Sequence, residues 1–426
     1  MTDIRVFKFG GASVKDAAGV QNMCSILRKY SNENLVVVVS AMGKTTNALE
    51  KVCNSFFSGN AASEALLEEI KIAHFTIVRE LFPGGNPHLE NELENIFTEI
   101  YWAIEEDQIK SYDFEYDQIV SQGEMLSTRI VAAWLAHQGL NVQLKDARDL
   151  IQTDNRYREA TVDWELSSQR IKDTLVFNDQ HNSLYLTQGF IGGTSENFTT
   201  TLGREGSDYT AAILAYALDA RDVVVWKDVP GVLDGDPREL EHTELIPELS
   251  YFDAIELAYY GASVIHPKTI KPLQNKHIPL RVKSFVDPDQ PGTLIYDDQQ
   301  QNRYSSVIFK KNQILLSVST RDFSFIVEEN LQDLFELFNK HHIKVNLMQQ
   351  AALTFSVCIG ADPERFEALT QELNLRYKIK YNIDCELITI RHYKEPLPDW
   401  AFQRGNILLE QRSRQTLQIV VKNNTQ

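Results

Sequence analysis

The chain has few cysteines, no long hydrophobic run and a deficit of positive charge. Its 426 residues include 4 cysteines, Cys24, Cys53, Cys358 and Cys385, and their scattered positions exclude a CxxC pair or a disulfide framework. No apolar run reaches the ~20 residues that a bilayer span requires. The first residues are polar and lack the hydrophobic stretch of a signal peptide. We therefore expect reduced thiols and a cytoplasmic protein without a membrane partner.

The charge balance narrows the possible partners further. Lys and Arg total 42 against 59 Asp and Glu, which gives a formal net charge of −17. This excess of acid disfavours a nucleic-acid surface. No group of His, Cys or carboxylate side chains has the spacing of a structural metal site. The length allows two to four domains at ~150 residues each.

Residues 1–296 alternate apolar, β-rich runs with amphipathic helices. This pattern predicts an α/β domain with a mostly parallel sheet and helices on both faces. We expect strands at 5–7, 35–39, 141–144, 184–187 and 222–226. The stretch from about 60 to 113 is acidic and helix-like, with a break at Pro83-Gly84-Gly85. We interpret it as a helical insertion outside the sheet.

The order of predicted elements changes after residue 296. A strand at 313–320 is followed by a helix, two strands, another helix and a strand ending at 382. This β-α-β-β-α-β order is typical of a small ferredoxin-like unit. Residues 305–426 therefore form, by this interpretation, two small α+β modules. The first covers about 313–383, and the second is split, over about 305–312 and 384–426.

The segment Lys8-Phe9-Gly10-Gly11-Ala12-Ser13-Val14 follows the first predicted strand. Backbone amides of the glycine pair can approach an anion closely, and Lys8 adds a positive charge. These features favour a phosphate site at the end of the strand. An ordinary strand-to-helix turn with a surface lysine is the alternative.

The segment from Ser40 to Thr46 follows the second predicted strand. It is not a P-loop, because Val38 stands where that motif requires its first glycine. Open α/β sheets bind ligands at the carboxyl ends of their strands, so Ser40 and Thr46 could donate hydrogen bonds to a small substrate there. A simple helix cap is equally compatible with these residues.

Two later segments carry the charges that a phosphorylated ligand needs. Thr201–Asp208 places glycines, Arg204 and Asp208 before a helix, which suits anion binding at a helix N-terminus; capping alone explains Asp208 but not Arg204. Trp226–Arg238 could be a bland loop, but Lys227 and Arg238 could also neutralise a polyphosphate. No nucleophile–base pair of the hydrolase type is evident. Phosphoryl transfer by positioning and charge neutralisation fits this inventory best.

In this order, the motifs strongly resemble those of the aspartokinases in the amino-acid kinase family. The matching segments are Lys8–Val14, Ser40–Gly43, Gly123–Ser127, Thr201–Asp208, Trp226–Arg238 and Tyr259–Pro267. The C-terminal region resembles the paired ACT modules of that family, with Gln411–Arg414 and Leu417–Lys422 as its last strands. The resemblance covers nearly the whole chain.

The resemblance implies ATP-dependent phosphorylation of the side-chain carboxylate of L-aspartate to 4-phospho-L-aspartate, the first step of the aspartate-derived amino-acid pathway. It implies catalytic roles for Lys8, which stabilises the transferring phosphoryl group, and Asp208, which orients lysines. Ser40, Thr46, Glu124 and Arg204 would bind aspartate, with Glu124 near its ammonium and Arg204 on its α-carboxylate. The nucleotide site would comprise Lys8, Gly10, Gly11, Ser13, Lys227, Asp228, Leu233, Arg238 and Ser263. Mg²⁺ would bridge the phosphates of ATP.

Four positions depart from the common pattern of that family. Lys227 stands in place of Thr or Ser, Leu233 in place of Tyr, Ser263 in place of Lys and Glu205 in place of Gly. Our hypothesis is that Lys227 or Lys268 supplies the positive charge missing at position 263.

The ACT-like region implies feedback inhibition by lysine or threonine. The effector is expected at Asp322, Phe323, Ser324, Phe325, Asn346, Met348 and Gln349. A purely structural dimerisation surface is the alternative for these residues. By resemblance the chain forms a homodimer or a dimer of dimers.

Two other functions compete with this interpretation. Another enzyme of the same family, such as a glutamate 5-kinase or an acetylglutamate kinase, is disfavoured by the ACT-like region and by Gly261–Pro267. A catalytically silent amino-acid-binding regulator is mildly favoured by Ser263, but Lys8, Arg204 and Asp208 are all in place.

Overall fold

The chain folds as two compact units. The first comprises Met1–Val232, Leu245–Ile255 and Val264–Gln301, and the second comprises Leu233–Glu244, Glu256–Ser263 and Asn302–Gln426. The computed structural model describes residues 3–59, 62–105, 111–177, 182–262, 265–297, 304–397, 400 and 403–422. No helix in these ranges is long and apolar enough to cross a membrane.

A sheet of eight strands, in the order β3-β4-β2-β1-β7-β9-β10-β8, organises the described part of the first unit. Its strands are β1 Ile4–Phe9, β2 Asn34–Val39, β3 Val142–Lys145, β4 Leu184–Gln188, β7 Asp222–Lys227, β8 Glu248–Ser250, β9 Leu280–Ser284 and β10 Thr293–Tyr296. Neighbouring strands pair parallel, except that β9 and β10 pair antiparallel. Two short strands, β5 (Ile191–Gly193) and β6 (Thr199–Thr201), form a separate antiparallel pair. The five predicted strands and the mostly parallel sheet are confirmed.

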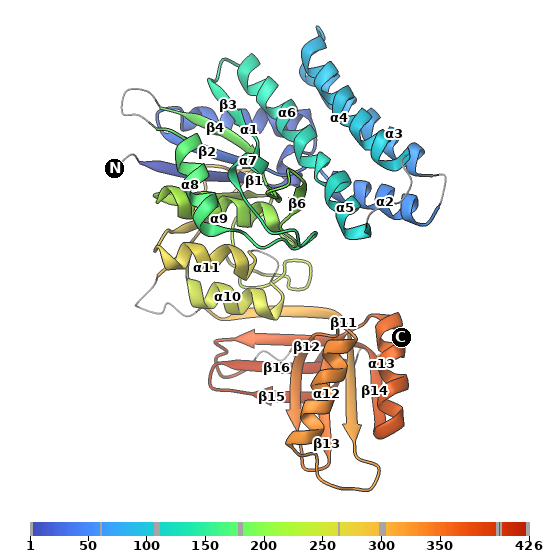
Figure 1. Cartoon of the computed structure of the whole chain (residues 1–426). Helices are drawn as coiled ribbons and strands as arrows, with labels where there is room; N and C mark the ends of the chain where they lie inside the picture. The colour runs from blue at the N-terminus through green and yellow to red at the C-terminus, as the bar shows by residue number, and fades with distance from the viewer. Residues whose placement is uncertain are drawn as a thin grey trace. The chain divides into compact units, whose positions relative to one another are not determined.

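Helices cover both faces of this sheet (Figure 1). The helices described before residue 297 are η1 Gly11–Val14, α1 Ala17–Lys29, α2 Thr45–Phe57, α3 Ser63–Leu81, α4 Pro87–Glu105, α5 Tyr112–Val120, α6 Gln122–His137, α7 Ala147–Leu150, α8 Trp164–Thr174, α9 Gly206–Leu218, α10 Tyr251–Tyr260 and α11 Pro267–Asn275, and not all of them contact the sheet. Strand β2 is valine-rich and buried along its whole length, as expected for a parallel strand covered on both sides.

Side-chain alternation along β1 separates a hydrophobic core from the candidate site. Phe7 and Phe9 belong to the core that includes residues of α1, α2 and α6. Lys8 lies between them in the sequence, so its side chain points to the opposite face of the sheet. Helix α9 packs against β1, β2 and β7. Because Lys8 contacts Asp208 of α9, its side chain lies on the face that α9 covers.

The stretch predicted to be a helical insertion contains α3 and α4, which lie side by side (Figure 1). Helix α3 ends at Leu81 and α4 begins at Pro87, so the break falls at the predicted Pro-Gly-Gly segment. Gly85 has a φ of +78°, a left-handed conformation that glycine adopts without strain. The residues at 60–61 and 106–110 lie outside the described residues.

An antiparallel sheet in the order β12-β13-β11-β14-β16-β15 forms the second unit. Its strands are β11 Ser306–Ser319, β12 Val345–Gln350, β13 Thr354–Gly360, β14 Lys378–Arg391, β15 Asn406–Arg412 and β16 Thr416–Lys422, and its helices are α12 Glu328–Lys340 and α13 Pro363–Arg376. Both helices contribute to one core with β11 and β13 (Figure 1). The β-α-β-β-α-β order is confirmed.

Strands β11 and β14 run through both predicted modules. The predicted module boundaries imply two strands, one on either side of residue 312, and two more, one on either side of residue 383. In the structure each pair is one strand, and the register shifts between Lys310 and Gln313 and again before Leu315. These irregularities let β11 change its register against β14 without ending. The division into modules at 313–383 and 305–312 plus 384–426 stays a prediction.

Two short segments from within the predicted 1–296 domain belong to the second unit. The backbone carbonyl of Asp234 accepts a hydrogen bond at 2.7 Å from the backbone N–H of Val307. Glu239 forms ion pairs with Lys311 at 2.5 Å and with Arg404 at 2.6 Å. These contacts explain why residues 233–244 group with the C-terminal sheet.

Candidate active site

The candidate site of the first unit lies where four neighbouring strands end. β4, β2, β1 and β7 are consecutive in the sheet and parallel. Lys8 is opposite Val38 of β2 and Val225 of β7. By alternation, Ser40 beyond β2 and Lys227 at the end of β7 therefore share the face of Lys8. The sheet thus gathers side chains that are far apart in the sequence at one carboxyl edge.

The glycine turn after β1 is tightly packed against the turn after β2. The backbone N–H of Gly43 donates to the carbonyl of Gly11 at 2.9 Å. A Cβ atom at position 11 would lie 2.6 Å from the carbonyl oxygen of Ala41, which no side chain can tolerate. At Gly10 a Cβ would lie 3.5 Å from Nζ of Lys8, an ordinary contact. Gly11 is therefore required for packing, whereas Gly10 keeps open the space beside Lys8.

Two lysines converge on the carboxylate of Asp208. Nζ of Lys8 lies 2.6 Å from Oδ1, and Nζ of Lys227 lies 3.5 Å from Oδ2. The Asp208 side chain is 2% exposed, against 10% for Lys8 and 20% for Lys227. Burial alone would raise the pKa of Asp208, but the two ammonium groups outweigh burial and hold this pKa below its usual value. The group carries two positive charges and one negative charge, which suits binding of a phosphoryl group.

Helix α9 brings Asp208 to the sheet through a close approach at Gly189. A Cβ at position 189 would lie 2.5 Å from Cβ of Ser207. The absence of a side chain there lets the first turn of α9 reach the end of β4. Since Asp208 lies in that first turn, the glycine after β4 positions the carboxylate.

Glu124, in the first turn of α6, is a buried carboxyl beside the turn after β2. Its Oε1 accepts a hydrogen bond at 3.2 Å from the backbone N–H of Ala41. Its Oε2 is buried and has no hydrogen-bond partner among the residues that the structure describes. Burial raises the pKa of Glu124 to about 8, although the Ala41 amide and the charge of Lys8 favour the ionised form. Such a group is suited to a ligand that brings a positive charge.

The other predicted aspartate-binding residues lie in turns around these groups. Ser40 is half-buried, and its backbone N–H donates to the carbonyl of Phe9 at 3.1 Å. Thr46 is half-buried in the first turn of α2. Arg204 is exposed in the segment between β6 and α9. The neighbouring Ala41 contacts Glu124, so the structure brings Ser40 and Glu124 together.

The predicted nucleotide residues have different surroundings. Ser13 is buried, and its Oγ donates to the carbonyl of Trp226 at 3.5 Å. Asp228 is exposed directly after β7. In the second unit, Leu233 is half-buried and Arg238 is exposed, with its guanidinium 2.7 Å from a carboxylate oxygen of Asp236. Ser263 lies outside the described residues.

Lys227 and Lys268, the two candidates for the positive charge missing at position 263, have different surroundings. Lys227 contacts Asp208, as described above. Lys268 is exposed in the first turn of α11 and lines a cavity of about 420 Å³ with Trp164 and Tyr209. Of the two, Lys227 is therefore the one beside the buried carboxylate.

Comparison with known proteins decides the family. The model of the amino acid kinase family matches residues 3–284. Lysine-sensitive aspartokinase 3 of Escherichia coli is 30% identical over 395 residues, which cover 91% of this chain and 85% of that protein. This chain belongs to the aspartokinases of the amino acid kinase family. The motif resemblance and the predicted enzyme class, an aspartate kinase, are thereby confirmed.

A plant aspartokinase and two crystal structures of E. coli aspartokinase III extend the comparison. Chloroplastic aspartokinase 1 of Arabidopsis thaliana is 33% identical over 387 residues, covering 87% of this chain and 66% of that protein. The crystal structure of E. coli aspartokinase III in complex with aspartate and ADP has a TM-score of 0.82 and 27% identity, covering 99% of this chain and 96% of that chain. The same enzyme in complex with lysine and aspartate has a TM-score of 0.81 and 28% identity, covering 98% and 96% of the two chains.

The residues predicted to bind an effector in this aspartokinase family member lie on two segments of the second unit. In the segment after β11, Asp322 accepts hydrogen bonds from the backbone N–H and the hydroxyl of Ser324. Phe323 and Phe325 are 80% and 67% exposed. On β12, Asn346 links Lys310 and Gln313 by hydrogen bonds of 3.0 and 2.8 Å. The remaining two, Met348 and Gln349, are exposed on β12.

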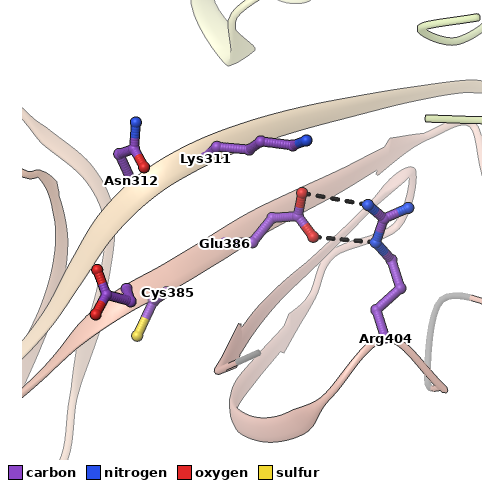
Figure 2. A pocket seen from close by; sticks show the side chains of 6 residues that line it. Lys311, Asn312, Cys385, Glu386 and Arg404 are labelled. Atoms are coloured by element: carbon purple, nitrogen blue, oxygen red, sulfur yellow. Dashed lines mark hydrogen bonds and ion pairs between the residues drawn. The ribbon is translucent and has the colours of Figure 1, made fainter. Parts of the chain in front are cut away.

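The second unit also contains a polar pocket that the sequence did not indicate. It has a volume of about 170 Å³ and is lined by Lys311, Asn312, Asp384, Cys385, Glu386 and Arg404. Figure 2 shows the guanidinium of Arg404 facing the carboxylate of Glu386, at 3.0 Å between Nε and Oε2. No motif signals this pocket, because its residues come from positions up to 93 apart on three segments.

Proposed function

We propose that this chain transfers the γ-phosphoryl group of ATP to the side-chain carboxylate of L-aspartate and forms 4-phospho-L-aspartate. The observation that carries the proposal is the buried Asp208 held between Lys8 and Lys227 at the carboxyl edge of the sheet. The named substrates of similar proteins support it, since E. coli aspartokinase III was solved with aspartate and ADP. The reaction would be the first step of the aspartate-derived amino-acid pathway.

In the proposed mechanism the aspartate carboxylate attacks the γ-phosphorus, a new P–O bond forms, and the bond to the β-phosphate oxygen breaks to release ADP. The attacking carboxylate has no proton to lose, so the protein needs no general base. Lys8 and Lys227 would neutralise the charge on the transferring group. Asp208 would hold both ammonium groups in place.

Aspartate would bind at the turns after β2 and before α9. Glu124 would receive the substrate ammonium on its buried Oε2, and Arg204 would pair with the α-carboxylate. Ser40 and Thr46 would donate hydroxyl hydrogen bonds. This arrangement would leave the side-chain carboxylate directed toward Lys8.

ATP would bind with its phosphates at Gly10, Gly11 and Ser13, and the resemblance also assigns Lys227, Asp228, Leu233, Arg238 and Ser263 to the nucleotide. The described residues contain no group of three or more His, Cys, Asp or Glu side chains suited to a metal. Both oxygens of Asp208 face lysines, so this carboxylate is a poor ligand for Mg²⁺. We therefore propose that Mg²⁺ would bind together with the phosphates of ATP and would neutralise part of their charge.

The second unit would carry feedback regulation. Lysine is the effector we favour, because aspartokinase 3 of E. coli is named lysine-sensitive and E. coli aspartokinase III was solved with lysine. Threonine is the alternative. The two ACT modules would bind the effector through Asp322–Phe325, Asn346, Met348 and Gln349, in a homodimer or a dimer of dimers.

Substrate competition tests the proposal. ADP release is measured with Mg-ATP and L-aspartate, L-glutamate or N-acetylglutamate, each with and without lysine or threonine. We expect turnover with aspartate, inhibited by lysine. Turnover with another acceptor would overturn the substrate, and amino-acid binding without turnover on any acceptor would favour a silent regulator.

A further inference from the structure

Asp117, near the end of α5, binds the segment that leads to the candidate active site. Its Oδ2 accepts hydrogen bonds from the backbone N–H groups of Thr201 and Arg158, at 2.8 and 2.9 Å. Its Oδ1 accepts from the hydroxyl of Thr201 at 2.7 Å. The residue is fully buried. A buried carboxylate with three donors is a strong local anchor, because losing it leaves those donors unsatisfied.

The next residue of α5 strengthens the same junction. The side-chain amide of Gln118 donates to the carbonyl of Thr199 at 2.8 Å and accepts from its backbone N–H at 3.2 Å. Two side chains of α5 thus hydrogen-bond to the first and last residues of β6, as a neighbouring strand would. The position of β6 is therefore fixed by the helix rather than by β5 alone.

The segment after β6 needs such an anchor because its backbone is strained at Glu205. Gly203 has a φ of +78°, which glycine adopts without strain, but Glu205 has a φ of +54° and carries a side chain. For a residue with a side chain this conformation costs ~1–2 kcal/mol. Between them lies Arg204, which the proposed function assigns to the substrate. The strain persists only if both ends of the segment are held, by α9 at one end and by Asp117 at the other.

Helix α5 is followed directly by α6, which carries Glu124, the second residue assigned to the substrate. Beyond Val120, the last residue of α5, Ser121 donates its backbone N–H to the carbonyl of Asp117, and α6 then presents Glu124. Asp117 therefore ties the backbone of Thr201, three residues before Arg204, to the chain segment that carries Glu124. Arg204 and Glu124 are the residues assigned to the α-carboxylate and the ammonium of the amino-acid substrate, respectively.

We propose that Asp117 is a positioning residue that sets the spacing between Arg204 and Glu124 and so determines the affinity for the amino-acid substrate. This inference rests on the proposed function for the identity of the substrate. Asp117 acts through Thr201 and does not itself touch a ligand. Its loss should therefore weaken aspartate binding and leave the nucleotide contacts in place.

Steady-state kinetics of three variants test this role. Asp117→Ala should raise KM for aspartate about tenfold, because it removes the acceptor for three hydrogen bonds, while KM for ATP stays near the wild-type value. Asp117→Asn should restore KM for aspartate. The amide oxygen can accept from both backbone N–H groups, and the amide nitrogen can donate to the Thr201 hydroxyl.

Asp113→Ala is the matched control. Asp113 is an exposed aspartate of the same helix, and it faces the guanidinium of Arg158 at 3.4 Å rather than β6. It should leave both KM values unchanged. An unchanged KM for aspartate in Asp117→Ala, or an equal rise in both KM values, would overturn the proposal.

A folding defect can be separated from the proposed role. If Asp117→Ala does not fold, Thr201→Val removes only the hydroxyl donor and should raise KM for aspartate alone; no change would overturn the proposal. If the wild-type chain does not phosphorylate aspartate, the proposed function is wrong, and the KM values no longer test the role of Asp117. Hydrogen exchange then tests the anchor itself: amides 199–205 should exchange faster in Asp117→Ala than in Asp113→Ala, and equal rates would refute it.

Discussion

Nζ of Lys8 lies 2.6 Å from Oδ1 of Asp208, across the junction between β1 and the first turn of α9. The two residues are 200 positions apart in the sequence, and the carboxylate is buried. A buried carboxylate with two lysines is ionised, so it cannot act as a proton donor at neutral pH. In the proposed mechanism it holds the two lysines in one geometry before the substrates arrive.

Asp208→Asn should therefore abolish most of the activity. The amide keeps the volume but leaves the two ammonium groups without a counter-charge, and we expect kcat to fall about a hundredfold or more. Turnover by ADP release measures this. The control is Asp219→Asn at the other end of α9, where the exposed carboxylate pairs with Lys276. Comparable activity in the two variants would contradict the role of Asp208.

Lys227 should supply the additional positive charge, and Lys268 should not. Lys227→Met removes a charge beside Asp208, so kcat/KM for ATP should fall about tenfold to a hundredfold. Lys227→Arg keeps the charge and should retain more activity than Lys227→Met. Lys268→Met changes a lysine of the α11 cavity and should behave as the wild type. A larger loss of activity in Lys268→Met than in Lys227→Met would show that Lys268 supplies the charge.

The sequence predicted the parts of the site that follow directly from strands. Lys8, Ser40 and Lys227 lie at the ends of buried apolar runs, and parallel strands necessarily bring such ends to one edge. The sequence did not predict the anchor at Asp117, because its partners Arg158 and Thr201 are 41 and 84 residues away. Nor did it predict that β11 and β14 each run through both predicted modules, since the polar residues at the bulges resemble strand ends.

Binding of aspartate should release a proton from Glu124. The pKa of about 8 in the empty site leaves this carboxyl mostly protonated at pH 7. The substrate ammonium favours the ionised form, so binding at pH 7 should release close to one proton, and affinity should increase from pH 6 to pH 8. Calorimetry in two buffers with different ionisation enthalpies measures the proton count. Glu124→Gln should bind more weakly and release none; an equal release would contradict the assignment.

The raised pKa of Glu124 should also make the stability of the ligand-free protein depend on pH. Because folding raises the pKa of Glu124, the folded state binds more protons than the unfolded state between about pH 4.5 and pH 8. The contribution of Glu124 to stability therefore decreases as pH rises through this range. The Tm of Glu124→Gln should increase relative to that of the wild type from pH 5 to pH 8. A constant difference between the two would show that the carboxyl has an ordinary pKa.

Glu205 combines backbone strain with a buried polar atom. Its φ is +54°, and its Oε2 is buried without a hydrogen-bond partner among the described residues. Glu205→Gly removes both the backbone strain and the buried carboxylate oxygen, and it should increase the free energy of unfolding. Glu205→Ala removes the carboxylate but keeps the Cβ atom in the left-handed conformation, so it isolates the effect of the backbone. We expect the glycine variant to be more stable than the alanine variant by about 0.5–1 kcal/mol in urea denaturation. If the alanine variant were as stable as the glycine variant, the carboxylate would be the source of the instability and the backbone would carry no strain.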